Sequence, residues 1–317
     1  MATPLMSAHR IPKLANLIIA GVNKAGSTSL FHYLCEHPDI SGSKDKETCY
    51  FLPLLYDEPI EPIASYEAQF AHCKNEKYRL EATPAYVFGG NKIADKIVDT
   101  LGPVKILIIL KDPVDRLISF YRRKKATFQL PEQMDFATYV KACLQKSNRE
   151  LDLHENQIYT GVYLGLYHRF LEPWLQRFGD DLKIVYFDDL KKDSRLFMKD
   201  ICNWLEIDNE FYDTFEFDIK NKSLNYKNRG LHRIAVAANN AGQRFWRNNP
   251  HFKKRILNVY YKMNGASFRK NEIDADTVAM IRKYYQEPNM KLAGMLQNYG
   301  YTNLPKWLEP ENVSELA

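Results

Sequence analysis

The chain has 317 residues, of which 45% are hydrophobic and 26% charged, which excludes wholesale disorder and suits one large globular domain or two modest ones. No apolar run reaches the roughly 18 to 20 residues that cross a bilayer, and the run at 17–22 starts too late for a signal peptide. Five scattered cysteines without a Cys-x-x-Cys pair argue against a disulfide framework or a structural zinc site: Cys35, Cys49, Cys73, Cys143 and Cys202. These features predict a soluble protein of the cytoplasm.

The charge of the chain is unevenly distributed. Residues 219–271 contain 13 of the 44 Lys and Arg residues and no Asp or Glu, so the rest of the chain holds 31 basic and 39 acidic residues, a net charge of −8. A block this one-sided is typical of a surface that faces an anion, either a nucleotide phosphate, an acidic acceptor or an acidic membrane, although a merely solvated basic face has the same pattern. No zinc finger, RNP sequence or basic zipper occurs in the block, so we expect no nucleic-acid partner.

Short apolar runs rich in β-branched residues alternate with helical patterns along the chain. The predicted strands are 17–22, 79–82, 105–110 and 182–187. The predicted helices are 27–37, one that begins at Asp112 and Pro113, and the stretches around 159–178, 190–205 and 277–298. Strands that alternate with helices predict a mostly parallel β-sheet flanked by helices on both faces, an α/β fold.

The predicted elements belong to a single unit. The chain contains no internal repeat, no low-complexity tract and no linker rich in Pro, Gly and Ser. We therefore predict one α/β domain over residues 17–310, with the basic helical block 219–271 inside it and a helical C-terminal extension. The N-terminal segment 1–16 precedes this domain and the tail 311–317 follows it.

A glycine-containing loop, residues 21–29, lies where the first strand leads into the first helix. Glycines let the backbone approach an anion, and the first amides of a helix point toward it. A Walker A loop has its lysine directly after the last glycine. Here Gly26 is followed by Ser27, the lysine stands earlier at Lys24, and no strand-terminal Asp is evident for magnesium. A phosphotransferase or NTPase remains an alternative, as does a turn that only caps a helix.

The displaced lysine suits the transfer of a sulfuryl group, which carries less negative charge than a phosphoryl group and has less need of a divalent cation. Residues 24–30 (KAGSTSL), followed by His37-Pro38, resemble the 5′-phosphosulfate loop of sulfotransferases that use 3′-phosphoadenosine-5′-phosphosulfate (PAPS), above all the carbohydrate and heparan-type branch and its bacterial relatives. The resemblance implies a P-loop-like fold, PAPS as donor, PAP as product and no metal. It implies a donor-binding loop made of Lys24, Ala25, Gly26, Ser27, Thr28 and Ser29.

A PAPS enzyme also has to hold the 3′-phosphate. The family uses an Arg at the end of a strand and a Ser eight residues later, and these positions correspond to Lys111 and Ser119 here. Lysine keeps the charge of the arginine but loses its bidentate geometry. A capped helix whose Lys111 and Ser119 merely face solvent is the alternative. Residues 227–230 resemble the Lys-Gly-Arg loop that closes over the cofactor in the family, which implies donor contacts from Lys227, Arg229 and Gly230.

Transfer to a hydroxyl or amine needs a base that takes the acceptor's proton. Residues 46–51 (KETCYF) resemble the Lys-Glu-x-x-x-Phe segment of heparan-type members, which implies Glu47 as the base, and burial would have to raise its pKa. The family's His two residues later is Cys49 here. Two more segments extend the resemblance, 81–86 (EATPAY) and 284–289 (YYQEPN).

The resemblance therefore predicts a sulfotransferase that moves the sulfuryl group of PAPS to a hydroxyl or amine of an acceptor. Lys24 would stabilise the bridging oxygen, Lys111, Ser119 and Arg229 would hold the 3′-phosphate, and Glu47 would be the general base. The glutamate-type motif favours a carbohydrate or glycolipid acceptor. A third hypothesis, outside catalysis, is an adaptor that binds anions or docks peripherally on acidic membrane through the basic block.

Overall fold

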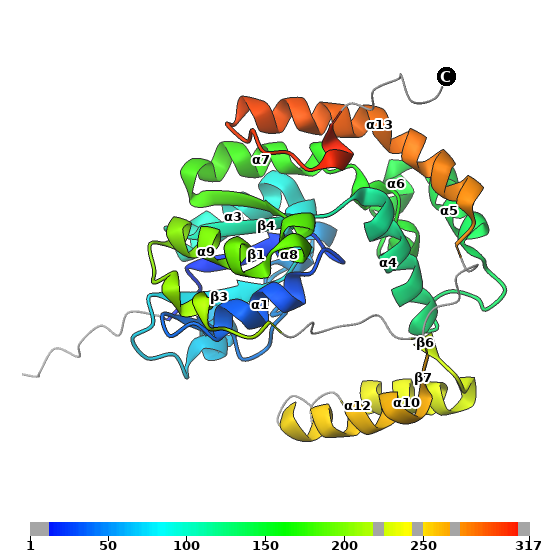
Figure 1. The fold of residues 1–317 in the computed structure, drawn as a ribbon, viewed down its shortest axis with the longest axis horizontal. Coiled ribbons are helices and arrows are strands. Elements are labelled where there is room, and N and C mark those ends of the chain that lie inside the picture. The colour runs from blue at the N-terminus through cyan, green and yellow to red at the C-terminus, as the bar shows by residue number, and fades with distance from the viewer. Residues whose placement is uncertain (1–12, 218–224, 243–249, 267–272, 310–317) are drawn as a thin grey trace, which may run out of the picture.

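A five-stranded parallel sheet forms the centre of the computed structural model, which describes residues 13–217, 225–242, 250–266 and 273–309 (Figure 1). The strand order is β2-β3-β1-β4-β5, and every neighbouring pair is parallel. The strands are β1 Leu17–Gly21, β2 Ile40–Gly42, β3 Tyr78–Ala82, β4 Lys105–Leu110 and β5 Leu182–Tyr186. β1 is fully buried because helices cover both of its faces, as expected for continuous apolar strands.

The predicted α/β fold is confirmed, and the sheet contains one strand that was not predicted. The four predicted strands correspond to β1, β3, β4 and β5 within one residue at each end. The missing strand is β2, which pairs with β3 at the edge of the sheet from Ile40↔Tyr78 to Gly42↔Leu80. Because β2 has three residues and only one of them is a large apolar residue, it carries no strand pattern of its own.

Helices enclose the sheet from both sides. α3 (Gly90–Leu101) and α7 (His168–Phe178) pack together on one face, with α13 (Ala275–Asn298) outside α7, while α1 (Ser27–Cys35), α8 (Phe187–Lys192) and α9 (Ser194–Leu205) lie on the other face (Figure 1). α4 (Pro113–Ala126) follows β4 and leads to the shorter helices α5 (Phe136–Gln145) and α6 (Asn148–Leu151) at one side of the sheet. α2 (Ile63–Glu67) is a single short turn between β2 and β3.

Two of the predicted helices needed correction. The helix expected around 159–178 begins only at His168, since the chain before it forms short 3-10 turns at His154–Tyr159 and Tyr163–Gly165. The stretch 190–205 is divided at Asp193, whose carboxylate accepts hydrogen bonds from the backbone N–H groups of Arg195 and Leu196, both at 3.0 Å. A side chain that caps a new helix ends the preceding one, so α8 and α9 are separate.

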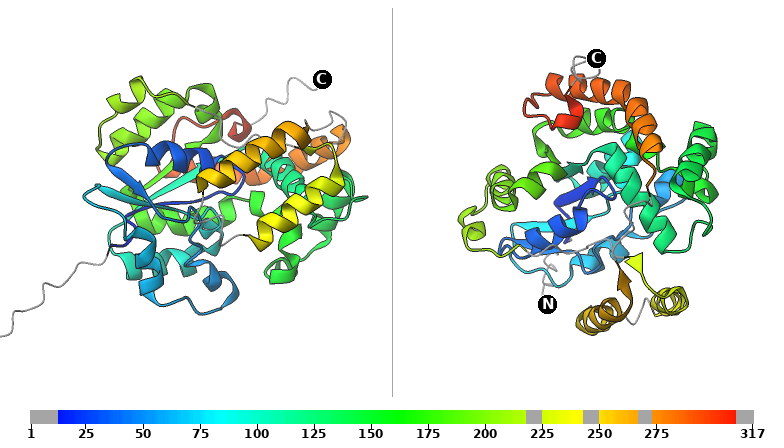
Figure 2. Two further views of the ribbon diagram at one scale, coloured as in Figure 1. Left: turned by 90° about the horizontal axis from the view of Figure 1, so that it is seen from below. Right: turned by 45° about the vertical axis from the view of Figure 1, so that its right-hand side comes forward.

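The basic block forms a helical hairpin that stands apart from the sheet, below α4 (Figures 1 and 2). Its helices are α10 (Arg229–Ala241) and α12 (Pro250–Asn264), and the short antiparallel strands β6 (Asn225–Tyr226) and β7 (Gly265–Ala266) close its base. Within the described part of the block, most residues are therefore helical. Residues 219–224, 243–249 and 267–271 of the block lie outside the described residues, as do 1–12 and the predicted tail 311–317.

No helix in the described part of the chain has both the length and the apolar character that a membrane span requires.

Candidate donor site at the carboxyl ends of the strands

The backbone conformation of the loop between β1 and α1 requires a glycine at position 26. Gly26 adopts a φ of +94°, and a Cβ atom built on it would lie 2.8 Å from the ring of Phe187. Glycine is therefore required both for the backbone conformation and for the close approach of Phe187. Lys24 also has a positive φ, of 69°, which is unusual for a residue with a side chain and typical of functional loops.

Helix α1 begins without a capping side chain. Its N-cap residue is Gly26, and no side chain among the described residues caps it, whereas Asp112, Asp193 and Asp274 cap α4, α9 and α13. The first amides of a helix are strong donors that favour an anion when no side chain takes them. The start of α1 is therefore suited to a phosphate, and the donor role of residues 24–29 stays a prediction.

A buried arginine that the sequence analysis did not single out supports this loop. Arg116, on α4, is fully buried, and its Nη1 donates to the Asn23 side-chain oxygen at 3.2 Å, while its Nη2 donates to the carbonyl of Gly161. The backbone N–H of Val22 donates to the carbonyl of Ile109 at 2.9 Å. The Arg116–Asn23 and Val22–Ile109 contacts fix the loop to α4, which carries Ser119, and to β4, which Lys111 follows.

Lys24 lies in a cluster of positive charge. The pKa of Lys24 is lowered from 10.5 to about 8, mainly by burial and then by the charges of Arg123 and Lys111, while the charge of Glu47 acts in the opposite direction. The side chains of these four residues therefore lie within electrostatic reach of one another. Positive side chains that repel one another in this way favour the binding of an anion, because the anion reduces their repulsion. Arg123 had no motif that could have indicated it.

Lys111 and Ser119 are brought together as predicted. Lys111 follows β4, Ser119 lies two turns into α4, and the Lys111 Nζ donates to the Ser119 Oγ at 3.2 Å. Asp112 holds the start of α4 by accepting from the N–H groups of Val114 and Asp115 at 2.8 and 3.1 Å. Burial lowers the pKa of Lys111 because it disfavours the charged form of the side chain. A bound anion would stabilise that charge, so the Lys111–Ser119 pair is also suited to binding an anion.

Phe187 joins the two parts of the site. Its ring lies against Gly26 of the loop, and the Lys111 Nζ lies 5.0 Å from the centre of the same ring. The Tyr167 hydroxyl donates to the carbonyl of Lys111 at 2.8 Å and fixes that strand end. The helix start and the Lys111–Ser119 pair are therefore neighbours across one aromatic side chain, as a ligand with two phosphates would need.

Glu47 lies near Lys24 but is not buried. Its side chain is 56% exposed and forms an ion pair with Lys46 at 2.9 Å. The burial that the sequence analysis required for a raised pKa is absent at Glu47. Its charge raises the pKa of Lys24, so the two side chains lie within electrostatic reach of each other, and the role of Glu47 as base stays a prediction.

A buried network holds the segment that carries Glu47. Glu81, at the end of β3, is fully buried, and its carboxylate accepts hydrogen bonds from the hydroxyls of Thr48, Tyr66 and Thr83 at 2.6, 2.7 and 2.7 Å. Burial raises the pKa of Glu81. The segment 81–86 resembles a family motif, but its anchoring role depends on contacts that the sequence does not show. The network fixes Thr48 and, with it, the neighbouring Glu47.

Residues 227–230, which resemble the loop that closes over the cofactor, lie near the C-terminal end of α4. Asn228 caps α10 by accepting from the Leu231 N–H at 3.0 Å, and the Arg229 guanidinium contacts the Glu132 carboxylate and lies 5.8 Å from the centre of the Phe128 ring. Lys227 and Gly230 flank this contact and are exposed. Since Ser119 lies about 10 Å of helix away from the end of α4, the structure does not bring Lys227, Arg229 and Gly230 to the Lys111–Ser119 pair, and their donor role stays a prediction.

The described residues contain no group of three or more His, Cys, Asp or Glu side chains arranged to hold a metal ion.

Comparisons with known proteins identify the family of this chain. Residues 14–294 match the model of the sulfotransferase domain family. A membrane-associated sulfotransferase, kil1, of Dictyostelium discoideum is 38% identical over 108 residues, which cover 34% of this chain and 22% of that protein. The mouse heparan sulfate glucosamine 3-O-sulfotransferase 3B1 is 27% identical over 167 residues, 52% of this chain and 39% of that protein.

Two further comparisons extend over more of the chain. The human bifunctional heparan sulfate N-deacetylase/N-sulfotransferase 1 is 24% identical over 315 residues, which cover 96% of this chain and 32% of that protein. The chain thus spans 39% or less of the length of these three curated relatives. The crystal structure of a sulfotransferase from Alicyclobacillus acidocaldarius shares the fold, with a TM-score of 0.57, 24% identity and coverage of 71% of this chain and 91% of that one. The match over 281 of 317 residues, from 14 to 294, confirms the family that the loop resembles: this chain belongs to the sulfotransferase domain family.

Proposed function

We propose that this protein transfers the sulfuryl group of PAPS to a hydroxyl or amine of an acceptor and releases PAP. The observation that carries the proposal is the pairing of two anion sites across Phe187. One is the uncapped start of α1 with Lys24, and the other is the Lys111–Ser119 pair. ATP has no 3′-phosphate for the second site, so the pairing favours a donor that carries one.

The proposal gives each of these residues a role. The amides and hydroxyls at the start of α1, from Gly26 to Ser29, bind the 5′-phosphate, and Lys111 and Ser119 bind the 3′-phosphate. Lys24 stabilises the negative charge that develops on the bridging oxygen as the sulfur–oxygen bond to the phosphate breaks. The acceptor oxygen or nitrogen forms the new bond to sulfur, its proton passes to the Glu47 carboxylate, and the electron pair of the broken bond leaves with PAP.

The acceptor in this proposal is a carbohydrate or the sugar of a glycolipid. Support comes from the glutamate-type segment that carries Glu47 and from relatives whose names specify heparan sulfate glucosamine. The exposed position of Glu47 also suits a large acceptor, because a carboxylate at the surface can reach a hydroxyl on a chain that does not enter the protein.

Ligand-dependent melting separates this function from a phosphotransferase. In EDTA, PAP at about 100 times its Kd is expected to stabilise the protein by about 2.7 kcal/mol, which raises the melting temperature by about 5 °C. ATP with magnesium is expected to produce a much smaller shift, since it lacks the 3′-phosphate. The proposal fails if ATP with magnesium raises the melting temperature while PAP leaves it unchanged.

A further inference from the structure

The α10–α12 hairpin contacts the rest of the described protein at its base. The His232 Nε2 lies 2.8 Å from the carbonyl oxygen of Ala126, the last residue of α4, and the His232 ring stacks on Tyr226 with ring centres 4.2 Å apart. Arg229 contacts Glu132 next to this point. From there the two helices extend below the body of the protein in Figure 1, as the right-hand view of Figure 2 also shows. The hairpin is thus anchored at one end and projects at the other.

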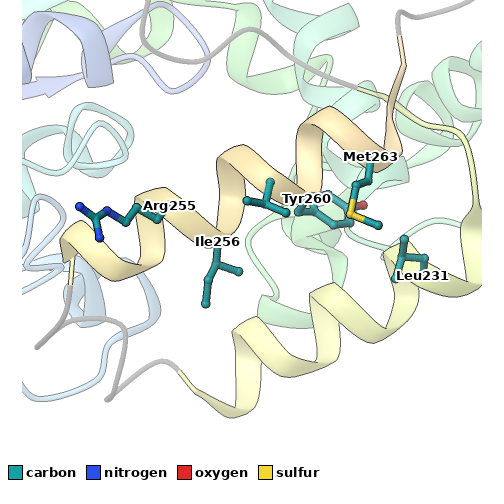
Figure 3. A pocket seen from close by; sticks show the side chains of 6 residues that line it. Leu231, Arg255, Ile256, Tyr260 and Met263 are labelled. Carbon is teal, nitrogen blue, oxygen red and sulfur yellow. The ribbon is translucent and has the colours of Figure 1, made fainter.

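Large apolar side chains are exposed on this hairpin. Of 14 such side chains exposed in the described residues, six lie on α10 and α12, which together have 28 residues: Leu231, Ile234, Phe252, Ile256, Val259 and Met263. Scattered exposed apolar residues are ordinary, but a gathering of this kind marks a surface that another body covers. A hollow of about 360 Å³ lies between the two helices. Figure 3 shows side chains that line it, Ile256 and Met263 from α12 and Leu231 from α10.

The apolar residues of α12 form one stripe with basic residues beside it. Phe252, Ile256, Val259 and Met263 recur at intervals of four, three and four residues, which places them on one face of a helix. Arg255 and Lys262, both exposed, lie seven residues apart and so follow one edge of that stripe. An apolar stripe bordered by Lys and Arg is the pattern of helices that lie in the headgroup region of a membrane.

The positive charge of the hairpin indicates which kind of partner covers this surface. Residues 219–271 have 13 basic and no acidic side chains, so a second copy of the chain would bring two strongly positive blocks together. Anionic phospholipids complement both features at once, since their headgroups attract the Lys and Arg residues while the interface accepts the apolar side chains. We propose that the α10–α12 hairpin docks the protein on an anionic membrane surface and inserts the stripe of α12 at the headgroup boundary. This inference concerns attachment alone and does not depend on sulfuryl transfer.

Vesicle co-sedimentation tests the inference with the full chain. We expect binding to phosphatidylcholine vesicles that contain phosphatidylserine, weak binding to phosphatidylcholine alone, and loss of most of the binding at roughly 0.5 M NaCl. The double variant Val259→Asp/Met263→Asp is expected to bind the anionic vesicles about tenfold more weakly, because two carboxylates replace side chains that would enter the interface.

Matched variants separate this face from general effects of charge. Leu196→Asp/Met290→Asp adds the same charge on α9 and α13, at side chains that are 65% and 60% exposed, against 59% and 66% for Val259 and Met263. It is expected to bind vesicles nearly as well as the unmodified protein. All of these side chains are exposed, so unchanged circular dichroism and melting temperatures are expected to confirm that both variants fold.

A second pair of variants tests the basic residues beside the apolar stripe of α12. Arg255→Gln/Lys262→Gln is expected to weaken binding to anionic vesicles several-fold, and Lys283→Gln/Lys306→Gln, which removes two exposed lysines elsewhere, is expected to weaken it much less. The inference is overturned if Val259→Asp/Met263→Asp sediments with anionic vesicles as well as its control does. It is also overturned if vesicles with and without phosphatidylserine bind the protein equally well. An oligomer that light scattering detects and that Val259→Asp/Met263→Asp dissociates would likewise overturn it, because the face would then serve self-association.

Discussion

Replacing Lys24 with methionine is expected to lower kcat for sulfuryl transfer by about 10²- to 10³-fold, the scale observed when one donor is removed from a site of developing negative charge. Methionine retains most of the length of the side chain but has no charge for the bridging oxygen. Steady-state kinetics with labelled PAPS measures the change. The control is Lys96→Met, on α3 at the face of the sheet opposite α1, which is expected to leave kcat unchanged.

The pH dependence of PAP binding provides a second signature of Lys24. Because burial and the charges of Arg123 and Lys111 lower the pKa of Lys24 to about 8, the side chain is largely protonated at pH 7 and loses its charge as the pH rises through 8. An anion binds the protonated form better, so PAP affinity is expected to be constant below pH 8 and to fall above it, by as much as about tenfold per pH unit. In Lys24→Met this break is expected to disappear. A variant with normal kcat and the same break would assign both effects to another group.

Replacing Glu47 with glutamine is expected to lower turnover by about 10²-fold or more, the usual effect of losing a general base, with PAP affinity nearly unchanged. Glutamine keeps the shape of the side chain but cannot take the acceptor's proton. Glu47 is exposed and paired with Lys46, so an acceptor at the surface of the protein can reach its carboxylate.

Glu61→Gln is the matched control for Glu47. Glu61 is an exposed carboxylate in the neighbouring segment, and its backbone carbonyl accepts a hydrogen bond from the Tyr50 hydroxyl at 2.9 Å. Its substitution is expected to leave turnover within about twofold of the unmodified protein, as for most surface positions. If Glu47→Gln turned over like Glu61→Gln, the proton would have to go to water or to a different side chain.

The strong strands and caps could be predicted because their signals are local. The run KILIIL at 105–110 is a buried strand with the predicted bounds, and Asp112 followed by Pro113 begins α4 as the capping rules require. β2 depends on pairing with β3, which is 38 residues away in sequence. The break at Asp193 was local too, but the apolar pattern on both sides of it hid the cap.

The site shows the same division between local and distant signals. Lys111 and Ser119 could be paired because the family has a basic residue at the end of a strand and a Ser eight residues later, and the structure brings these two side chains together. Arg116 contacts Asn23 across 93 residues, and Glu81 contacts Thr48 across 33, so only the folded chain identifies these supports. The family pattern suggested Arg229 for the 3′-phosphate, whereas in the structure its guanidinium faces Glu132.

The most direct measurement of the donor site compares PAP with adenosine 5′-phosphate, which differs only in lacking the 3′-phosphate. Isothermal titration is done without metal, with the unmodified protein and with Lys111→Ala. We expect Lys111→Ala to weaken PAP by about 10- to 100-fold, the value of a hydrogen bond to a charged group, and to leave adenosine 5′-phosphate within about twofold. Equal losses for both nucleotides would contradict a 3′-phosphate held by Lys111 and Ser119, and with it the assignment of PAPS as donor.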